Sequence, residues 1–225
     1  MKKLTITILF AVAAGLLSAF ISPSQFNYSQ TDAVQSNLLN NEEVAGLLFM
    51  REEEKLAHDL YSAFYDIYGL QAFQNIAASE LSHVESIKVL LEKYGVSDPA
   101  AYSEAGIFID PTLQDLYNQL ITRGSQSLAE ALKVGAAVEE IDILDLQARI
   151  EQTSMPDIIQ VYKNLEAGSR NHLRAYVSLL RNQTREGYTP GYLPTDEYQR
   201  IISNLPGNNN QGRQSERGTG SPRNN

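Results

Sequence analysis

The stretch NIAASELSHVESIKVLLEKYG, residues 75–95, has the pattern of a buried helix that carries polar groups on its buried face. Its apolar residues recur at helical spacing: Ile76, Val84, Ile87 and Leu91. Glu80 and His83 fall on the same face, and because they are three residues apart, their side chains point the same way. An unpaired carboxylate in an apolar core costs several kcal/mol or takes up a proton. The stretch therefore predicts a helix that presents both groups to a partner inside the protein.

Helical periodicity, rather than the alternation typical of strands, continues on both sides of this stretch. Glycine and proline divide the chain into helical segments, because glycine commonly ends a helix and proline is tolerated in its first turn. The predicted helices span residues 41–68, 71–94, 111–124, 125–153 and 155–184, and a short helix follows within 187–205. The fourth is expected to begin at Ser125 or Ser127, both good N-cap residues. These segments predict an all-α domain over residues 41–205.

The lengths of the connections indicate how the four long helices are arranged. A tight turn at Gly69 joins the first two, and a short turn between Ser154 and Pro156 joins the last two. About thirty residues separate the pairs and include a short accessory helix. Short loops join antiparallel neighbours, and a long crossover between two hairpins is typical of the ferritin-like variant of the four-helix bundle.

Each long helix carries polar residues near the middle of its apolar face. In the first hairpin, Glu54 lies 15 residues before Gly69 and His83 lies 14 residues after it. In the second, Glu139 lies 16 residues before the centre of the turn and His172 lies 17 residues after it. At a rise of 1.5 Å per residue, all four positions are roughly 20 Å or slightly more from their turn. We therefore expect them to meet in one layer.

A divalent cation would supply the positive charge that such a layer lacks. Carboxylate and imidazole donors suit iron, manganese or zinc, and the Glu-x-x-His unit of Glu80 and His83 occurs in di-metal carboxylate bundles. The alternative is that these groups lie on solvated helix faces, as expected for most of the charged run REEEK at residues 51–55. The candidate ligands are Glu54, Glu80, His83, Glu139 and His172, with Asp142 and Glu140 as further carboxylates. The choice between Glu139 and Glu140 stays open.

Four segments in order carry a resemblance: REEEKLAHDLY, NIAASELSHVESIKVLLEKYGVSDP, VEEIDILDL and GSRNHLRAY. Together they resemble the rubrerythrin-type proteins of the ferritin-like superfamily and, more closely, the domain of unknown function family 2202, over residues 41–203. The resemblance implies a helical bundle in which the five candidate ligands bind metal, most simply a di-iron centre. Where a rubrerythrin-type fourth helix has Glu-x-x-His, this chain has Ser169 and His172. One carboxylate is thus missing, and Asp142 is the residue that could replace it.

Further side chains are expected around the ligands. Tyr61 and Tyr176 are positioned either to donate hydrogen bonds to the ligating carboxylates or to pack as core aromatics. Ser169 is expected beside them. His58, one turn after Glu54, has no counterpart at the same level and is expected outside the ligand set.

Two classes of function follow from this prediction. The first is an oxidoreductase of the ferroxidase or peroxidase type, with dioxygen, peroxide or ferrous iron as its small substrate. The second is a non-enzymatic helical bundle that binds metal for stability or sequestration, or that acts through its surface in an envelope or matrix. The chain has no cysteine, so it lacks the rubredoxin-like site of a full rubrerythrin.

The two ends of the chain predict its location. Residues 1–25 contain two lysines and then an apolar run, which is typical of a signal peptide or an N-terminal anchor. Residues 26–40 are expected to be a polar linker, and residues 206–225 a disordered tail. The protein is therefore expected to be exported: periplasmic, extracellular, or anchored and touching the membrane only through this segment. A net charge of −9 argues against nucleic acid as a partner, and a homodimer is compatible with the sequence.

Overall fold

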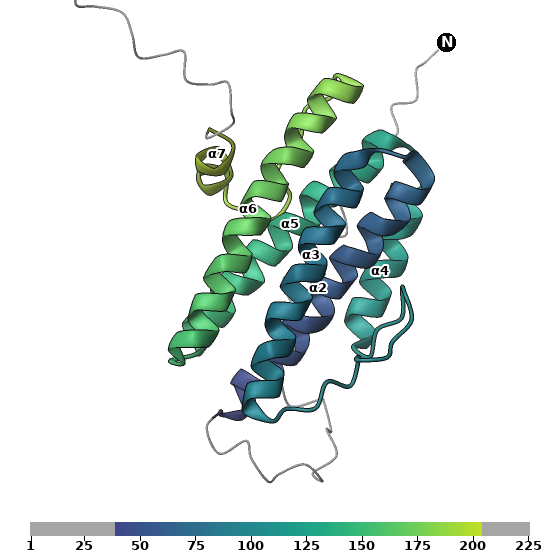
Figure 1. Cartoon of the computed structure of the whole chain (residues 1–225). Helices are drawn as coiled ribbons and strands as arrows, with labels where there is room; N and C mark the ends of the chain where they lie inside the picture. The colour runs from purple at the N-terminus through teal and green to yellow at the C-terminus, as the bar shows by residue number, and fades with distance from the viewer. Residues whose placement is uncertain (1–38, 204–225) are drawn as a thin grey trace, which may run out of the picture.

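The structure, a computed structural model, describes residues 39–203, which contain six α-helices and no strand (Figure 1). The helices are α2 (Asn41–Tyr68), α3 (Gln71–Tyr94), α4 (Pro111–Gly124), α5 (Leu128–Gln152), α6 (Pro156–Thr184) and α7 (Thr195–Ser203). The all-α prediction is confirmed, and a helix is present in every predicted segment. The predicted signal peptide or anchor, most of the linker and the predicted tail lie outside the described residues. Within residues 39–203, no helix combines the length and apolar character needed to cross a membrane.

Local chemistry sets the ends of these helices. At the start of α2, the Asn40 side chain accepts a hydrogen bond from Glu43 N, and the Glu43 carboxylate accepts one from Asn40 N, both at 2.9 Å. Gly69 ends α2 with φ 63°, a left-handed conformation that a Cβ would strain. Of the two serines considered for the start of α5, Ser127 is the cap, and its hydroxyl accepts from Glu130 N at 3.2 Å.

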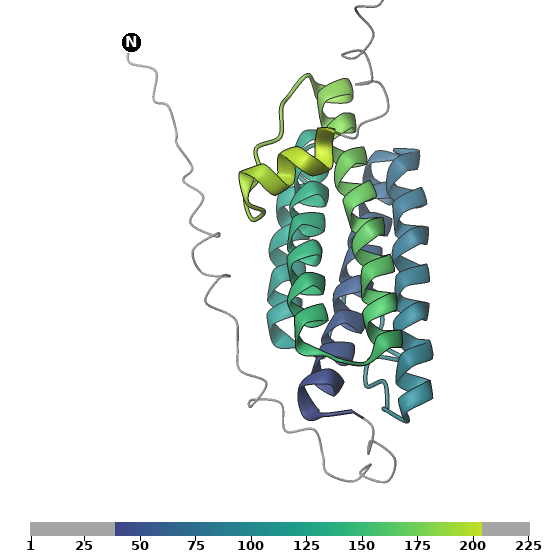
Figure 2. The ribbon, with the colours of Figure 1, turned by 90° about the vertical axis from the view of Figure 1, so that its left-hand side faces the viewer.

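The four long helices lie side by side as two antiparallel hairpins (Figures 1 and 2). One hairpin is α2 and α3, and the other is α5 and α6. The hairpins contact each other through α2 with α5 and through α3 with α6. The accessory helix α4 belongs to the long connection between the hairpins and packs on α2 and α5, whereas the short α7 packs on α6.

The apolar core inside these helices consists of two separate clusters. The cluster nearer the α2–α3 turn includes Leu60 and Phe73, and the cluster at the other end includes Leu47 and Leu91. Along α2, Glu54 lies between the residues of one cluster and those of the other. The polar layer predicted from the sequence therefore interrupts the apolar core at its centre.

Candidate metal centre

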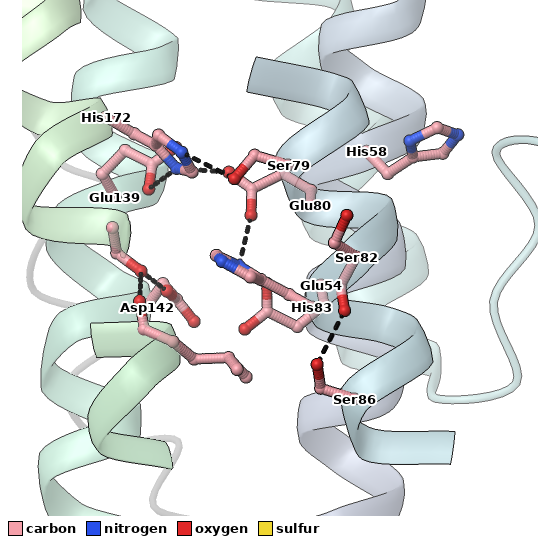
Figure 3. Close-up of polar contacts among 12 residues, drawn as sticks. Glu54, His58, Ser79, Glu80, Ser82, His83, Ser86, Glu139, Asp142 and His172 are labelled. Carbon is pink, nitrogen blue, oxygen red and sulfur yellow. Dashed lines mark hydrogen bonds and ion pairs between the residues drawn. The ribbon is translucent and has the colours of Figure 1, made fainter. Parts of the chain in front are cut away.

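Five polar side chains from four helices meet in this layer (Figure 3). Their donor atoms form two groups, and within each group the atoms lie within 4.8 Å of one another. The first group is Glu54, Glu80 and His83, and the second is Glu80, Glu139 and His172. All five main candidate ligands thus come together, and Glu80 belongs to both groups.

Glu80 lies between the two imidazoles. Its Oε2 is 2.7 Å from Nδ1 of His83, and its Oε1 is 2.7 Å from Nδ1 of His172. The outer carboxylates complete the pattern, because Glu54 Oε2 lies 3.1 Å from His83 Nδ1 and Glu139 Oε2 lies 3.5 Å from His172 Nδ1. Each imidazole therefore faces the shared carboxylate and one carboxylate of its own.

Several of these buried atoms have no hydrogen-bond partner. Glu80 Oε1 and His172 Nδ1 are close enough to form an ion pair, but neither atom has a hydrogen-bond partner. Glu54 Oε1 is also buried and unpartnered. Buried polar groups are usually satisfied, so this convergence of unsatisfied donor atoms is compatible with a cation-binding site.

The ionisable groups influence one another strongly. Burial raises the pKa of Glu54 and Glu139 to about 7, and the charge of Glu80 contributes to both shifts. Burial also opposes ionisation of Glu80, but close contacts with His172 and His83 outweigh it and lower the pKa of Glu80 to about 2. The imidazoles behave in the opposite way: burial lowers their pKa, but the neighbouring carboxylates raise it to about 11 for His83 and about 10 for His172. In the metal-free protein, both imidazoles therefore carry the positive charge at neutral pH.

Neighbouring side chains orient the candidate ligands. The Tyr61 hydroxyl donates to Glu139 Oε1 at 2.6 Å, as one of the two roles expected for it, and its ring centroid lies 5.2 Å from that of Tyr176. The Tyr176 hydroxyl has no hydrogen-bond partner and instead contributes a buried aromatic ring. Ser79 was not expected at the site, yet its Oγ lies 3.1 Å from His172 Nε2, which fixes the ring with Nδ1 toward Glu80.

Glycine at position 168 allows α6 to approach His83 closely. A Cβ at this position would lie 2.8 Å from both Cε1 and Nε2 of the imidazole, closer than real contacts allow. This residue is next to the Ser169 that replaces the expected glutamate. The α6 helix therefore contributes space as well as His172 to the layer.

Asp142 is buried beside the two groups without belonging to either. Its Oδ2 accepts a hydrogen bond from the Ser169 hydroxyl, and its Oδ1 has no partner. Burial and the nearby carboxylates Glu54 and Glu139 raise its pKa well above its usual range. Asp142 was expected to replace the carboxylate that is absent at position 169, and in the structure it binds Ser169 itself.

Two other residues considered from the sequence lie apart from the ligands. Glu140 is fully buried, but its carboxylate accepts backbone hydrogen bonds from residues 191–193 at 2.7–3.3 Å and fixes the segment before α7. Glu139, and not Glu140, therefore faces the imidazoles. His58 points away from the layer in Figure 3, and its Nδ1 lies 2.8 Å from the carbonyl oxygen of Ala77.

The charged run at residues 51–55 differs most from expectation. It was expected to face water except at Glu54, but all five residues are at most 8% exposed. Arg51, Glu52 and Lys55 bind the connection between the hairpins; their partners there are Asp98, Ala100, Glu104, Ile107, Ile109 and Asp110. The long connection is the signal in the sequence that could have indicated this, because its backbone groups need hydrogen-bond partners once they are covered.

Glu53, the remaining member of the run, is buried against α5. It forms a hydrogen bond with Asp145, and one of the two carboxyl groups must therefore keep a proton. Burial, followed by the charges of Asp145 and Asp142, raises the pKa of Glu53 well above its usual range. This pair was not predicted, because Glu53 is not on the apolar face that was assigned to α2.

Comparison with known proteins places the chain in a family. Residues 43–205 match the model of an uncharacterized protein domain, DUF2202. The chain is 47% identical over 165 residues to the uncharacterized protein MJ0754 of Methanocaldococcus jannaschii, covering 73% of this chain and 89% of that protein. The crystal structure of hypothetical protein MJ0754 is similar, with a TM-score of 0.71 over 73% of this chain and 94% of that one. The chain therefore belongs to the DUF2202 family.

Proposed function

We propose that this chain is a ferritin-like metal-binding protein whose central layer holds two divalent transition-metal ions that share Glu80. The position of Glu80 carries the proposal. Its two oxygens each lie 2.7 Å from the imidazole of a different donor group, as required of a carboxylate that serves two ions.

The residues present fit such ions. A bound cation would satisfy the buried atoms that lack hydrogen-bond partners, namely Glu54 Oε1, Glu80 Oε1 and His172 Nδ1. Oxygen and imidazole donors suit iron, manganese or zinc, and the resemblance to rubrerythrin-type proteins favours a di-iron site. When bound, iron would supply one-electron redox chemistry to this layer.

The ferritin-like part of the proposal is supported by the topology and by the sources of the ligands. Two antiparallel hairpins with a long connection contribute ligands from all four long helices. Because Ser169 replaces a carboxylate, each donor group contains one outer glutamate, the shared Glu80 and one histidine. These three protein donors would hold each ion.

We further propose a redox function of the ferroxidase or peroxidase type, with ferrous iron, dioxygen or peroxide as substrate. The carboxylates Glu54, Glu80 and Glu139 are 1–2% exposed, whereas the side chains of His83 and His172 are 12% and 11% exposed. Only small molecules would reach such a layer, and bulk water is excluded from it. Tyr61 and Ser79 would hold Glu139 and His172 in place during turnover.

Metal content and turnover together test this proposal. Purified, tag-free protein is analysed for metals, stripped, and titrated with ferrous iron under anaerobic conditions; peroxidase and ferroxidase rates are then measured. Glu80→Ala is the test variant, and Glu140→Gln is the control. Glu140 is also a buried carboxylate, but it accepts hydrogen bonds from the backbone and does not face the imidazoles. We expect two ions and turnover in wild type and in the control, and loss of both in Glu80→Ala.

The possible results separate the two classes of function. Two bound ions without turnover would assign the protein to metal storage or metal-dependent stability. Wild-type protein that binds no transition metal would refute the whole proposal.

We also propose that the protein is exported, as the N-terminal segment predicts. Cell fractionation tests this: the protein should be found in the medium or the envelope fraction, and protein confined to the cytoplasm would contradict it.

A further inference from the structure

Three more acids lie beside the proposed metal centre: Glu53 on α2, and Asp142 and Asp145 on α5. Glu53 is hydrogen-bonded to Asp145, and its carboxylate also feels the charges of Asp142 and Glu54. Glu53 is adjacent to Glu54 along α2, and Asp142 lies one helical turn after Glu139 on α5. Neither donor group of the centre includes them.

Basic side chains contribute little to this group of acids among the described residues. Within residues 39–203, none of the three forms an ion pair with lysine or arginine. Glu53 Oε2 and Asp142 Oδ1 are buried and have no hydrogen-bond partner, although the residues are only 4% and 6% exposed. Unpartnered oxygens at this depth are costly in a purely structural cluster, so they indicate a cationic ligand.

The acids also form a gradient from the surface to the centre. Glu139, Asp142 and Asp145 follow one another at intervals of three residues along α5, so Asp145 is about 9 Å from Glu139 along the helix axis. Asp145 is half-buried at the outer end, Glu53 and Asp142 are buried, and Glu54 at the inner end is 1% exposed. The exposure of these carboxylates therefore decreases from Asp145 toward Glu54.

We propose that Asp145, Glu53 and Asp142 form the route along which divalent cations pass between solvent and the metal centre at Glu54. This inference rests on the proposed function, because it assigns a path to the ions that the centre is proposed to bind. Oxygen ligands replace the water that a small divalent cation loses on the way. The charge of the outer Asp145 would attract the cation to the entrance.

The geometry favours passage over a third stable site. Among the described residues, the two groups in which three donor atoms lie within 4.8 Å of one another both exclude Glu53, Asp142 and Asp145. An ion at these acids would therefore have fewer protein ligands than an ion at the centre. Arg149 is the nearby basic residue; its Nη1 donates to Gln152 and its guanidinium lies over the Phe49 ring.

The test is the rate at which metal-free protein takes up Co²⁺, measured by stopped-flow absorption, with the bound stoichiometry measured separately. Asp145→Asn removes the outer charge at a half-buried position and preserves the shape of the side chain. Asp196→Asn is the matched control, because it removes the same charge from a side chain that is 74% exposed on α7. Glu53→Gln tests the buried part of the route.

At low ionic strength we expect Asp145→Asn to slow uptake about tenfold, with a smaller dependence on salt than in wild type. The number of bound ions and their dissociation constants should stay at the wild-type values, which also shows that the variant is folded. Glu53→Gln should behave alike, and Asp196→Asn should match wild type.

Unchanged uptake by Asp145→Asn and Glu53→Gln would overturn the route while leaving the metal centre intact. The route is also wrong if these variants bind one ion fewer at an unchanged rate, since the acids would then hold a third ion. Wild-type protein that takes up no Co²⁺ would instead remove the proposed function, and the route with it.

Discussion

Two isosteric substitutions in the same layer should change the stability of the metal-free protein in opposite directions. Glu80→Gln removes the carboxylate between the two imidazoles. Glu139→Gln removes a carboxyl group whose ionised form is disfavoured by burial and by the charge of Glu80. Each substitution removes one buried negative charge and keeps the side-chain shape. The contrast therefore isolates the electrostatic role of each residue.

The magnitudes follow from the two pKa shifts. The pKa of Glu80 falls from 4.5 to about 2, and at 1.36 kcal/mol per unit this corresponds to about 3 kcal/mol of stabilisation. The pKa of Glu139 rises from 4.5 to about 7, which corresponds to a penalty of similar size once the group is ionised. For a domain of this length, about 3 kcal/mol is a shift of roughly 6–12 °C in Tm.

The pH dependence differs between the two groups. Because the folded-state pKa of Glu80 is depressed, its contribution is present above pH 4.5 and is lost as the pH falls toward 2. The pKa of Glu139 is raised, so its penalty is absent below pH 4.5 and complete above pH 7. At pH 8, Glu80→Gln should therefore lower Tm and Glu139→Gln should raise it, whereas at pH 4.5 only the Glu80 effect should persist.

Thermal and urea unfolding of metal-free protein at pH 8 and pH 4.5, with wild type alongside, measure these differences. With saturating metal at pH 8, both variants should be less stable than wild type, because each has lost a ligand. A Glu80→Gln protein that is more stable than wild type without metal would refute the reasoning, since Glu80 would then be a repelled acid rather than the partner of both imidazoles.

Three further outcomes are expected. Ser79→Ala removes the partner of His172 Nε2 and should weaken metal binding about tenfold in competition with a chelator, since the ring loses its fixed orientation. Because the pKa values of His83 and His172 are about 11 and about 10, metal binding should release protons, which calorimetry in buffers of different ionisation enthalpy measures. The affinity for metal should therefore rise from pH 6 to pH 9. Glu140→Ala leaves the backbone N–H groups of residues 191–193 without their acceptor; it should destabilise the protein by about 3 kcal/mol in urea unfolding without changing metal stoichiometry.

The helices, and the height of each polar residue along them, could be predicted from the sequence because both depend on short-range rules. Glycine stops, serine caps and the rise per residue were enough to place Glu54 and His83 at one height, and the Glu-x-x-His spacing put Glu80 beside His83. The sequence left Glu139 and Glu140 as alternatives. The structure separates them, because Glu140 binds backbone groups about fifty residues further along the chain.

The remaining features were missed because they depend on contacts between distant segments. The burial of residues 51–55 follows from a connection that folds back over α2, and no periodicity in α2 encodes that. Glu53 and Asp145 meet only because α2 packs on α5 at a particular rotation. Ser79 was not considered for the site, because its contact with His172 forms only when α3 packs on α6.

The most direct measurement of the central claim is an X-ray diffraction experiment on metal-loaded crystals, with anomalous data collected at the absorption edge of the added metal. Two anomalous peaks are predicted, one between Glu54, Glu80 and His83, and one between Glu80, Glu139 and His172, with a Glu80 oxygen contacting each. An absence of peaks in this layer, or peaks at surface acids alone, would contradict the account.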